Sequence, residues 1–373
     1  MAEETLLEVK NLIVRFYTYA GIVEALDGVN LKIRPGEILG LVGETGCGKS
    51  VTSFSILQLV PPPGVIEEGE IHFNRDGKII NVRSLRKDAL RQIRGKDISM
   101  VFQEPRAYLN PVYTVETQIG EALLTHRKNE FLKKAIETLE KAGKKASFEK
   151  KVYERMLNKP KAIITRIMAK FTRQKTLKAE IRKEVVNLLR SVEIADPERV
   201  AKMYPFELSG GMAQRAVIAM ALSCQPAMLI ADEPTTNLDV TVQAQILNLI
   251  RELRKTYKSS ILYITHDLGV IAELCDRVAV MYAGNVVETA DVYELFESPL
   301  HPYTKALLES IPKPGEEFKS IPGTVPSLIN PPKGCRFHDR CLFEMDICQK
   351  VKPEFIEVKK DHFVACHLYG GSK

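Results

Sequence analysis

The chain has 373 residues, of which 45% are hydrophobic and 27% are charged, so it is long enough for a large folded core with an appended domain. It has no apolar run near the roughly 18 residues of a membrane span, and its first residues lack the profile of a signal peptide. We therefore expect a cytosolic protein. The net charge is +6, but residues 127–183 carry 19 basic and 6 acidic side chains, which marks a basic segment.

Short apolar segments alternate with helical patterns along the chain. Strands joined by helical crossovers predict a mostly parallel sheet and an α/β core. The expected strands span 7–10, 12–16, 25–33, 38–42, 69–82, 228–231 and 260–265, with helices at 51–57 and 240–257 and a mostly helical stretch over 84–223. Prolines become frequent after about residue 288, so we expect an irregular tail there.

An eight-residue segment between the strand at 38–42 and the helix at 51–57 fits the pattern G-x-x-x-x-G-K-[ST]. Its glycines let the backbone curl so that N–H groups point at phosphate oxygens, beside the positive end of the next helix. Lys49 would reach the β and γ phosphates, and the Ser50 hydroxyl would bind Mg²⁺. The predicted ATP or GTP site consists of Gly43, Glu44, Thr45, Gly46, Cys47, Gly48, Lys49, Ser50 and Val51.

Two carboxylates follow the apolar strand at 228–231. Carboxylates at the C-terminal edge of a parallel sheet face the ligand crevice. We therefore expect Asp232 to hold Mg²⁺ and Glu233 to polarise the attacking water. The alternative is an acidic pair that caps the next loop, but the phosphate loop favours the catalytic interpretation.

A serine and two glycines open the helix that precedes this strand. Ser209 would cap the helix, and Gly210 and Gly211 would let an anion approach its positive end. Alone, such a segment is more often only a cap. In this place, L-S-G-G-M at 208–212 resembles the L-S-G-G-Q signature of ABC transporter ATP-binding subunits. The resemblance implies a P-loop NTPase ABC nucleotide-binding domain, with a RecA-like core, an antiparallel β subdomain and a helical subdomain.

Further residues match the motifs of that family in order. The resemblance implies that Gln103 contacts Mg²⁺ and the water, and that His266 contacts the γ-phosphate. It also implies that Asp239, in the loop at 237–239, reaches the partner subunit, although Asn237 replaces the usual alanine. Considered alone, Gln103 would be a surface residue and His266 an ordinary polar residue at a strand end.

The resemblance also indicates how the nucleotide is held. Phe16 aligns best with the aromatic residue that stacks on adenine, Tyr17 and Tyr19 are alternatives, and core packing is the plainer interpretation. In the family, two subunits face head to tail, and each ATP lies between one phosphate loop and the other chain's signature. Closure excludes water and positions the γ-phosphate. We expect at least one competent half-site.

The tail resembles the C-terminal extension of the oligopeptide/dipeptide importer family at 301–312 and 321–323. The resemblance implies uptake of peptides, or of oligosaccharides or nickel as in related members. It also implies a paralogous ATPase subunit as heterodimer partner, two transmembrane permease subunits and an extracellular substrate-binding protein, with the chain peripheral at the cytoplasmic face of the membrane. We expect an ATPase domain over 1–287, including a helical subdomain at about 104–223, and an extension over 288–373.

Four of the seven cysteines lie in this extension, separated by five, six and seventeen residues: Cys335, Cys341, Cys348 and Cys366. Four thiols in a short segment suit zinc or an iron–sulfur cluster. The C-x-x-C pairs common in zinc sites are absent, and the spacing resembles that of family members with a [4Fe–4S] cluster. We therefore favour the cluster over zinc and over unligated thiols, with His338, His362 and His367 as weaker ligand candidates.

The basic segment at 127–183 is an insertion relative to the family pattern. Its residues 162–173 predict an amphipathic helix of the kind that lies on a membrane surface, which suggests contact with anionic lipid. The plainer interpretation is a lysine-rich helical hairpin packed on its own domain, and nucleic acid is not expected as a partner. The apolar face holds Ile163, Ile164, Ile167, Met168 and Phe171, surrounded by Arg166, Lys170 and Arg173.

These residues together predict the energy-coupling ATPase of an importer. A soluble ABC-type ATPase of DNA repair or translation would usually carry tandem cassettes or a long coiled coil, and the sequence shows neither. A regulatory subunit that binds ATP without turnover is less expected, because Glu233 and His266 are present. ATPase subunits do not touch the cargo, so only family frequency favours peptide over sugar or metal chelate.

Overall fold

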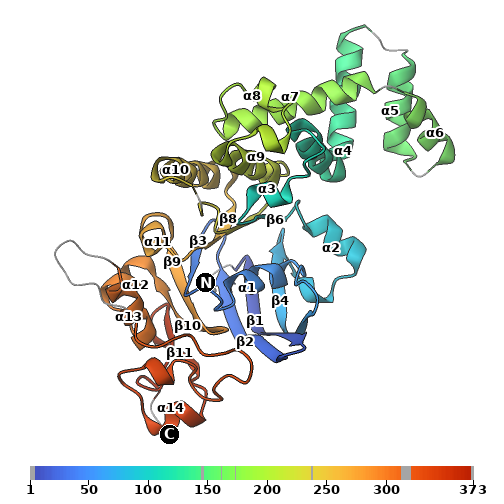
Figure 1. Cartoon of the computed structure of the whole chain (residues 1–373). Coiled ribbons are helices and arrows are strands. Elements are labelled where there is room, and N and C mark those ends of the chain that lie inside the picture. The colour runs from blue at the N-terminus through green and yellow to red at the C-terminus, as the bar shows by residue number, and fades with distance from the viewer. Residues whose placement is uncertain are drawn as a thin grey trace. The chain divides into compact units, whose positions relative to one another are not determined.

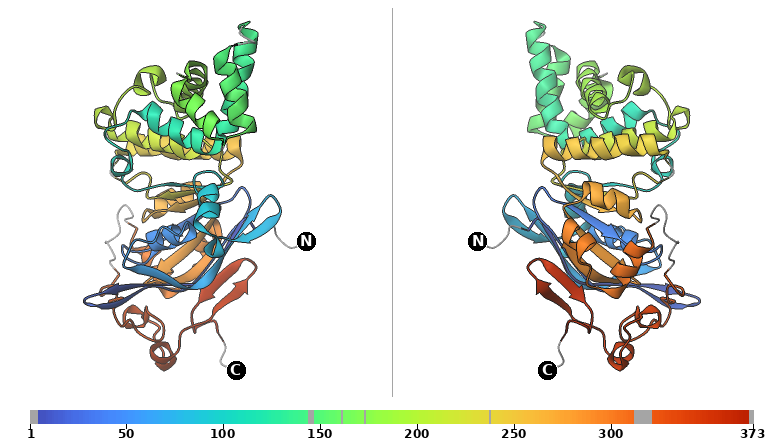
Figure 2. Two further views of the ribbon diagram at one scale, coloured as in Figure 1. Left: turned by 90° about the vertical axis from the view of Figure 1, so that its right-hand side faces the viewer. Right: turned by 90° about the vertical axis from the view of Figure 1, so that its left-hand side faces the viewer.

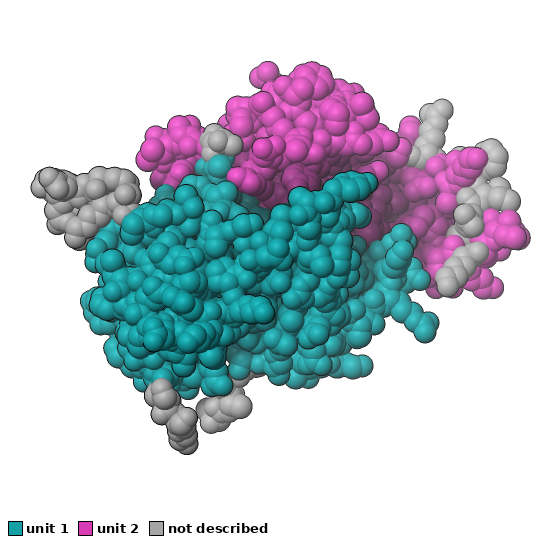
Figure 3. Space-filling model, turned by 60° about the horizontal axis from the view of Figure 1, so that its bottom comes forward, with its two compact units in different colours: residues 1–94, 227–236, 250–373 teal, residues 95–226, 237–249 magenta. Residues whose placement is uncertain are grey.

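The computed structural model describes residues 5–143, 147–160, 162–172, 174–236, 238–311 and 321–370. The chain divides into two compact units (Figure 3). Unit 1 comprises residues 1–94, 227–236 and 250–373, and unit 2 comprises residues 95–226 and 237–249. The phosphate loop and the C-terminal extension thus belong to unit 1, and the signature segment belongs to unit 2. None of the described helices combines the length and the apolar character that crossing a membrane requires.

The core of unit 1 is a sheet with parallel central strands (Figure 1). β3 (Ile38–Val42) pairs in parallel with β8 (Ser260–Ile264) and β9 (Arg277–Tyr282), and β8 pairs in parallel with β7 (Met228–Asp232). Every residue of these strands is buried, which explains their nearly continuous apolar sequences. The expected α/β core is confirmed, and α1 (Lys49–Ile56) follows β3 across the phosphate loop.

The N-terminal part of unit 1 forms a separate antiparallel sheet. β1 (Leu7–Thr18) pairs with β2 (Gly21–Ile33) and with β4 (Gly64–Arg75), and β5 (Lys78–Asn81) pairs with β4. The sequence suggested two short strands where β1 is one long strand. Asn11, with φ of 46°, lies at a register shift within β1 and makes a bulge rather than a strand end.

The C-terminal extension is more regular than its prolines suggested. It contains β11 (Phe355–Lys359) and β12 (His362–Ala365), which form the red hairpin near the C-terminus in Figure 2. β12 pairs antiparallel with β10 (Asn285–Asp291), which itself pairs with β9, so the tail continues the central sheet of unit 1. The expectation of an irregular tail is therefore wrong here, because the partner of β12 lies far away in the sequence and leaves no local signal.

Unit 2 is mostly helical and holds the basic segment. α4 (Val115–Lys141) packs against α7 (Lys175–Ser191) and α5 (Phe148–Asn158), and α5 also packs against α6 (Ile163–Phe171). The other elements of unit 2 are β6 (Ile98–Val101), α3 (Pro105–Tyr108), α8 (Pro197–Val200) and α9 (Gly210–Leu222). Unit 1 adds α2 (Lys87–Ile93), α11 (Leu268–Leu274), α12 (Val292–Glu297), α13 (Pro302–Glu309) and α14 (Asp346–Lys350), and α10 (Val240–Tyr257) has residues in both units.

Candidate functional site

The phosphate loop runs from the end of β3 into α1. Gly43 and Gly48 have φ values of 153° and 106°, which residues other than glycine rarely adopt. A Cβ atom at Gly43 would lie 2.1 Å from the carbonyl oxygen of Met281, so only glycine fits at this position. No side chain caps the N-terminus of α1. The first N–H groups of this helix therefore lack a side-chain acceptor and can bind an anion.

The Lys49 side chain is buried within the loop. Its Nζ donates to the carbonyl oxygens of Gly43, at 2.7 Å, and of Glu44, at 3.2 Å. These two carbonyls hold the ammonium group against the same loop that the sequence predicts to surround phosphates. Phosphate oxygens would give this group charged acceptors, which make stronger hydrogen bonds than carbonyls do.

Asp232, at the end of β7, meets the first turn of α1. Its Oδ1 accepts a hydrogen bond from the Ser50 hydroxyl at 3.2 Å, and its Oδ2 accepts one from Ser53 at 3.5 Å. Burial raises the pKa of Asp232, the bond from Ser50 opposes that rise, and the neighbouring Glu233 adds to it. The structure thus brings together the predicted Mg²⁺ ligands Ser50 and Asp232, and their oxygens are of the kind that Mg²⁺ prefers.

Glu233 and His266 meet just beyond the ends of β7 and β8. Oε1 of Glu233 lies 3.3 Å from Nδ1 of His266, and its Oε2 accepts a hydrogen bond from the Thr236 hydroxyl at 2.9 Å. The backbone of Glu233 has φ of 45°, a left-handed conformation that costs a residue of this type about 1–3 kcal/mol and clusters at active sites. The His266 side chain is 59% exposed and the Glu233 side chain 16%, so the carboxylate is fixed beside an accessible imidazole.

The predicted signature residues open α9 in unit 2. The Ser209 hydroxyl accepts a hydrogen bond from the Met212 N–H at 3.3 Å, and Gly210 and Gly211 form the first turn. A Cβ atom at Gly211 would lie 3.0 Å from a methyl group of Val242, so the glycine also permits close packing at the start of α10. The sequence pattern of a capped helix start is thereby found in the structure.

Two more predicted site residues also belong to unit 2. Gln103 directly follows β6, and Asp239 accepts a hydrogen bond from the Val242 N–H at 2.9 Å before α10 begins. Asn237, the departure from the family pattern, lies outside the described residues. Asp239 therefore has a local capping role that its sequence motif alone does not indicate.

The predicted adenine-stacking residue Phe16 lies in β1 of unit 1. It is half-buried, and its ring packs so closely on Gly64 that a Cβ atom there would lie 2.6 Å from Cε1 of Phe16. Of the alternatives, Tyr17 is 50% exposed and donates a hydrogen bond to Glu67, and Tyr19 is fully exposed. All three lie at the end of β1 or just after it, where this strand meets β2.

The C-terminal extension contacts the phosphate loop at Glu44. Two nitrogens of the Arg340 guanidinium bond the two carboxylate oxygens of Glu44, at 2.8 and 3.1 Å. The Tyr303 hydroxyl accepts a hydrogen bond from the Glu44 N–H at 3.0 Å. Sequence reasoning missed both contacts. Tyr303 lies in the tail segment that resembled the importer family, but nothing in the sequence marked Arg340.

The four predicted cluster ligands, Cys335, Cys341, Cys348 and Cys366, line one small cavity. Burial raises the pKa of the Cys335 thiol to about 12, and it also raises the pKa values of Cys341 and Cys366. Among the residues that the structure describes, no three His, Cys, Asp or Glu side chains are placed to hold a single metal ion.

The three histidines considered as weaker ligands have other partners. His338 Nδ1 lies 3.1 Å from Glu344, and His362 Nε2 lies 2.8 Å from the fully buried carboxylate of Glu288. His367 Nε2 lies 2.8 Å from the carbonyl oxygen of Val351. These contacts occupy a ring nitrogen of each histidine and explain its position without a metal.

Comparison with known proteins assigns this arrangement to a family. Residues 26–236 match the ABC transporter family, and residues 287–348 match the C-terminal region of oligopeptide/dipeptide transporters. The chain belongs to the ATP-binding subunits of oligopeptide/dipeptide ABC transporters. Its relatives include the dipeptide transport ATP-binding protein DppD of Bacillus subtilis (strain 168), which is 44% identical over 370 residues, covering 98% of this chain and 95% of DppD. The oligopeptide transport ATP-binding protein OppD of the same organism is 44% identical over 368 residues, covering 97% and 88%.

A solved structure gives the same result for the fold. A dimeric ATP-binding cassette in a post-hydrolysis state, bound to ADP and Pi, is similar with a TM-score of 0.55 and 25% identity, covering 77% of this chain and 98% of the cassette. The ABC nucleotide-binding fold and the importer ATPase predicted from the sequence are confirmed, and the protein hydrolyses ATP for transport. The alternative of an ATPase uncoupled from transport is set aside. None of these descriptions names an iron–sulfur cluster, so the cluster stays a prediction.

Proposed function

We propose that this ABC ATPase powers the uptake of oligopeptides or dipeptides, using ATP and Mg²⁺ bound at residues 43–51 of unit 1. The main support for this nucleotide site is the hydrogen bond from Ser50 to Asp232, next to the buried Lys49. The peptide cargo is supported by the similarity to two peptide transport proteins, which this chain matches over most of their length. Oligosaccharides are the alternative cargo. We place the ATPase domain at 1–287 and the extension at 288–373.

Each proposed catalytic residue has one task. Lys49 binds the β and γ phosphates, and Ser50 and Asp232 hold Mg²⁺, with Gln103 as a further ligand. The ion, when bound, neutralises charge on the phosphates. Glu233 polarises the attacking water, and Thr236 and His266 fix the orientation of its carboxylate. His266 is exposed enough to contact a γ-phosphate as well.

The signature residues act, in this proposal, on the nucleotide of a second subunit. Ser209, Gly210 and Gly211 would face ATP held by a paralogous ATPase, while Asp239 contacts that partner and Phe16 stacks on this chain's adenine. The similarity to a dimeric cassette supports such a pair. Two permease subunits and an extracellular binding protein would complete the importer, with this chain at the cytoplasmic face of the membrane.

Reconstitution tests the proposal. The complex that copurifies with the full chain is placed in lipid vesicles with its binding protein, and uptake of labelled peptides is measured. We expect ATP-dependent uptake that Lys49→Ala abolishes. Uptake of oligosaccharides but of no peptide would contradict the peptide assignment, and ATP turnover unaffected by Lys49→Ala would contradict the site.

We further propose that the four cysteines of the extension hold a [4Fe–4S] cluster. All four line one cavity, and a [4Fe–4S] cluster is held by four cysteine thiolates. His301, in the same cavity wall, supports the fit. Its Nδ1 accepts a hydrogen bond from the Tyr303 N–H at 3.0 Å, so its Nε2 carries the proton, and this buried donor has no partner. A thiolate or sulfide would supply the missing acceptor.

The cluster would add to the stability of the extension, because only the folded chain brings its four ligands together. Anaerobic purification followed by iron, sulfide and zinc analysis tests this assignment. We expect about four iron atoms per chain, absorption near 400 nm, and loss of both in Cys341→Ser. Stoichiometric zinc without iron would contradict the cluster, and so would a colourless protein that contains neither metal.

We also propose that α6 in the basic insertion contacts anionic lipid headgroups. Ile163 is 74% exposed and Ile164 is 56% exposed, so two residues of its predicted apolar face are open to solvent. The side chains of Arg166, Ile167, Phe171 and Arg173 lie outside the described set. Cosedimentation with vesicles of rising anionic lipid content tests the contact. We expect binding that high salt weakens, and indifference to lipid charge would contradict it.

A further inference from the structure

Arg340 is a buried, fully engaged side chain that links the extension to the phosphate loop. Its side chain is 5% exposed, and besides the two bonds to Glu44, its Nε donates to the Pro322 carbonyl at 2.7 Å and its Nη1 to the Tyr282 hydroxyl at 3.2 Å. The guanidinium carbon also lies 5.7 Å from the ring centre of Tyr282 and 5.9 Å from that of Phe337. These contacts fix the position from which Arg340 holds Glu44.

Glu44 is in turn hydrogen-bonded to Lys49. Its N–H donates to Tyr303, and its carbonyl oxygen accepts hydrogen bonds from Lys49 Nζ and from the Cys47 N–H, both at 3.2 Å. One residue of the loop therefore connects the extension on one side with the predicted phosphate-binding lysine on the other. Loss of the Arg340 contact would free the Glu44 side chain beside the phosphate site.

A cluster of aromatic rings supports both contacts to Glu44. Tyr303 and Phe337 are buried, and the ring centres of Tyr282, Tyr303 and Phe337 lie 4.6 to 5.4 Å apart. Such ring pairs contribute packing energy beyond their buried area. Tyr303 lies in the first turn of α13, whereas Phe337 lies between two of the cysteines in sequence. Two rings of the extension and Tyr282 of β9 thus pack together around the two groups that touch the loop.

The negative charge of Glu44 makes its contact with Arg340 relevant to ATP binding. A triphosphate is strongly anionic, and an unpaired carboxylate on the loop that binds it would repel it. Arg340 neutralises that carboxylate with a forked pair of hydrogen bonds, the geometry for which a guanidinium is suited. We propose that Arg340 is a positioning residue of the ATPase, which acts through Glu44 to hold the phosphate loop and to shield ATP from the Glu44 carboxylate.

The proposal rests on the assignment of residues 43–51 as the nucleotide site, and it does not depend on what the cysteines bind. Lys49→Ala tests that assignment separately. If Lys49→Ala leaves ATP binding intact, the site itself is misassigned. If Lys49→Ala abolishes binding and Arg340 variants do not alter it, only the positioning role fails.

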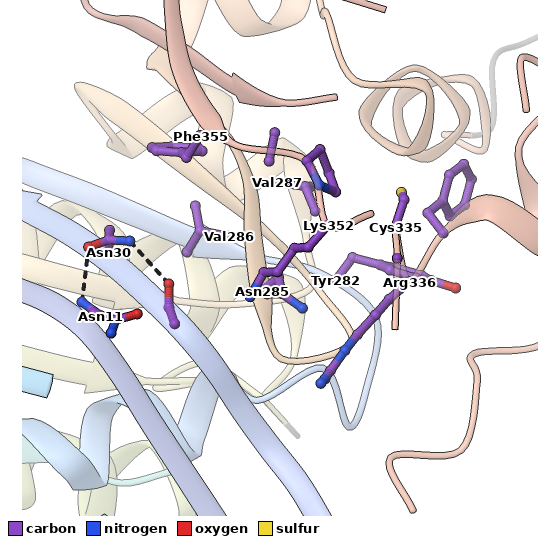
Figure 4. A pocket seen from close by; sticks show the side chains of 15 residues that line it. Asn11, Asn30, Tyr282, Asn285, Val286, Val287, Cys335, Arg336, Lys352 and Phe355 are labelled. Atoms are coloured by element: carbon purple, nitrogen blue, oxygen red, sulfur yellow. Dashed lines mark hydrogen bonds between the residues drawn. The ribbon is translucent and has the colours of Figure 1, made fainter. Parts of the chain in front are cut away.

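Arg336 provides a matched control in the same extension. Its side chain is 4% exposed, and it pairs with Glu24 at 2.9 Å and donates to the Ala283 carbonyl at 2.6 Å, whereas Arg340 pairs with Glu44. Figure 4 shows Arg336 and Cys335 on the extension side of a cavity of about 310 Å³, with Asn11 and Asn30 on the side of β1 and β2. Arg336→Met therefore removes an equally buried arginine that docks the extension elsewhere.

The test measures binding of a fluorescent ATP analogue with Mg²⁺ to the full chain. We expect Arg340→Met to raise the Kd about tenfold, and the double variant Arg340→Met/Glu44→Gln to return it to within about threefold of the unaltered protein. Adding Glu44→Gln to Arg336→Met should give no such recovery. If Arg340 had a purely structural role, the double variant would bind ATP no better than Arg340→Met, because a second substitution would weaken the fold further.

Two results would overturn the proposal: an unchanged Kd in folded Arg340→Met, or a Kd in the double variant no lower than in Arg340→Met alone. Thermal melting shows whether each variant is folded. Should Arg340→Met not fold, Arg340→Lys takes its place, because lysine keeps the charge but loses the forked pairing. The expected rise in Kd is then about threefold and is again reversed by Glu44→Gln, and absence of either change counts against the role.

Discussion

The phosphate loop and the C-terminal extension, both in unit 1, differ in how the sequence specifies them. The loop is contiguous, so its glycines and Lys49 can be recognised as one pattern. The extension works through pairs that lie far apart, such as Arg340 with Glu44 and His362 with Glu288. The comparison teaches that local patterns reveal the chemistry of this ATPase, whereas distant contacts determine what holds that chemistry in place.

The largest expected effect lies on the catalytic side of this comparison. In Glu233→Gln, the attacking water would lose the carboxylate that we propose polarises it, while Lys49 and Ser50 would still bind ATP. Steady-state hydrolysis should fall by about 10²- to 10⁴-fold while ATP remains bound. Phosphate release and retained nucleotide are measured on the same sample. Undiminished turnover would remove Glu233 from its proposed role.

Two glycines of the loop, Gly43 and Gly46, allow the cost of a steric clash to be distinguished from the cost of a left-handed backbone. Gly43→Ala would place a Cβ atom 2.1 Å from the Met281 carbonyl oxygen, whereas a Cβ atom at Gly46, with φ of 81°, would meet no atom within 4 Å. We expect Gly43→Ala to destabilise the protein by about 3 kcal/mol or more and Gly46→Ala by about 1–2 kcal/mol. Denaturant unfolding measures both, and equal losses would show that the close contact with Met281 is relieved at no cost.

The extension should show a pH dependence of its stability that arises from one buried histidine. In protein prepared without the proposed cluster, burial lowers the pKa of His301 to about 4, against about 6.5 in the unfolded chain, so the fold keeps the ring neutral while unfolding protonates it. Stability should therefore fall as the pH drops from about 6.5 to about 4, by roughly 3 kcal/mol in total from this residue.

The control for this pH dependence is His301→Gln, which keeps an acceptor for the Tyr303 N–H but does not titrate. Melting curves between pH 4 and pH 7 compare the two proteins. The difference in stability between them should change steadily over this range. A constant difference would mean that His301 has the same pKa in the folded and unfolded states.

The smallest effect is expected in the insertion of unit 2. Ile163 and Ile164 are exposed, so replacing both with serine should change the free energy of unfolding by no more than about 0.5 kcal/mol per site. The same double variant should bind anionic vesicles more weakly than the unaltered protein does. A large loss of stability would instead favour a hairpin packed on its own domain, and unchanged vesicle binding would contradict the lipid contact.

Much of the fold and of the candidate site could be predicted because its signals are local. The apolar runs at β3, β7 and β8 indicated buried parallel strands, and Ser209 indicated a helix start. Asp232 and Ser50 were expected to share an ion because each occupies a defined end of an element. Thr236, which holds Glu233, gave no such signal, since a threonine in a loop is ordinary.

The remainder depends on contacts that no local pattern contains. β12 looked irregular because its partner β10 lies far earlier in the chain. Nothing in the sequence singled out Arg340, and only the fold shows it buried against Glu44. The tail's prolines indicated an irregular segment, but they could not show that β11 and β12 join the central sheet or that Tyr303 and Phe337 are buried.

Hydrogen exchange of the loop amides tests most directly whether the extension holds the phosphate loop. Exchange is followed by mass spectrometry on the full chain without nucleotide, with Arg336→Met as the control. Faster exchange at residues 43–48 in Arg340→Met, and much less change there in Arg336→Met, is the result that our account predicts. Equal exchange of these amides in Arg340→Met and in the unaltered protein would contradict it.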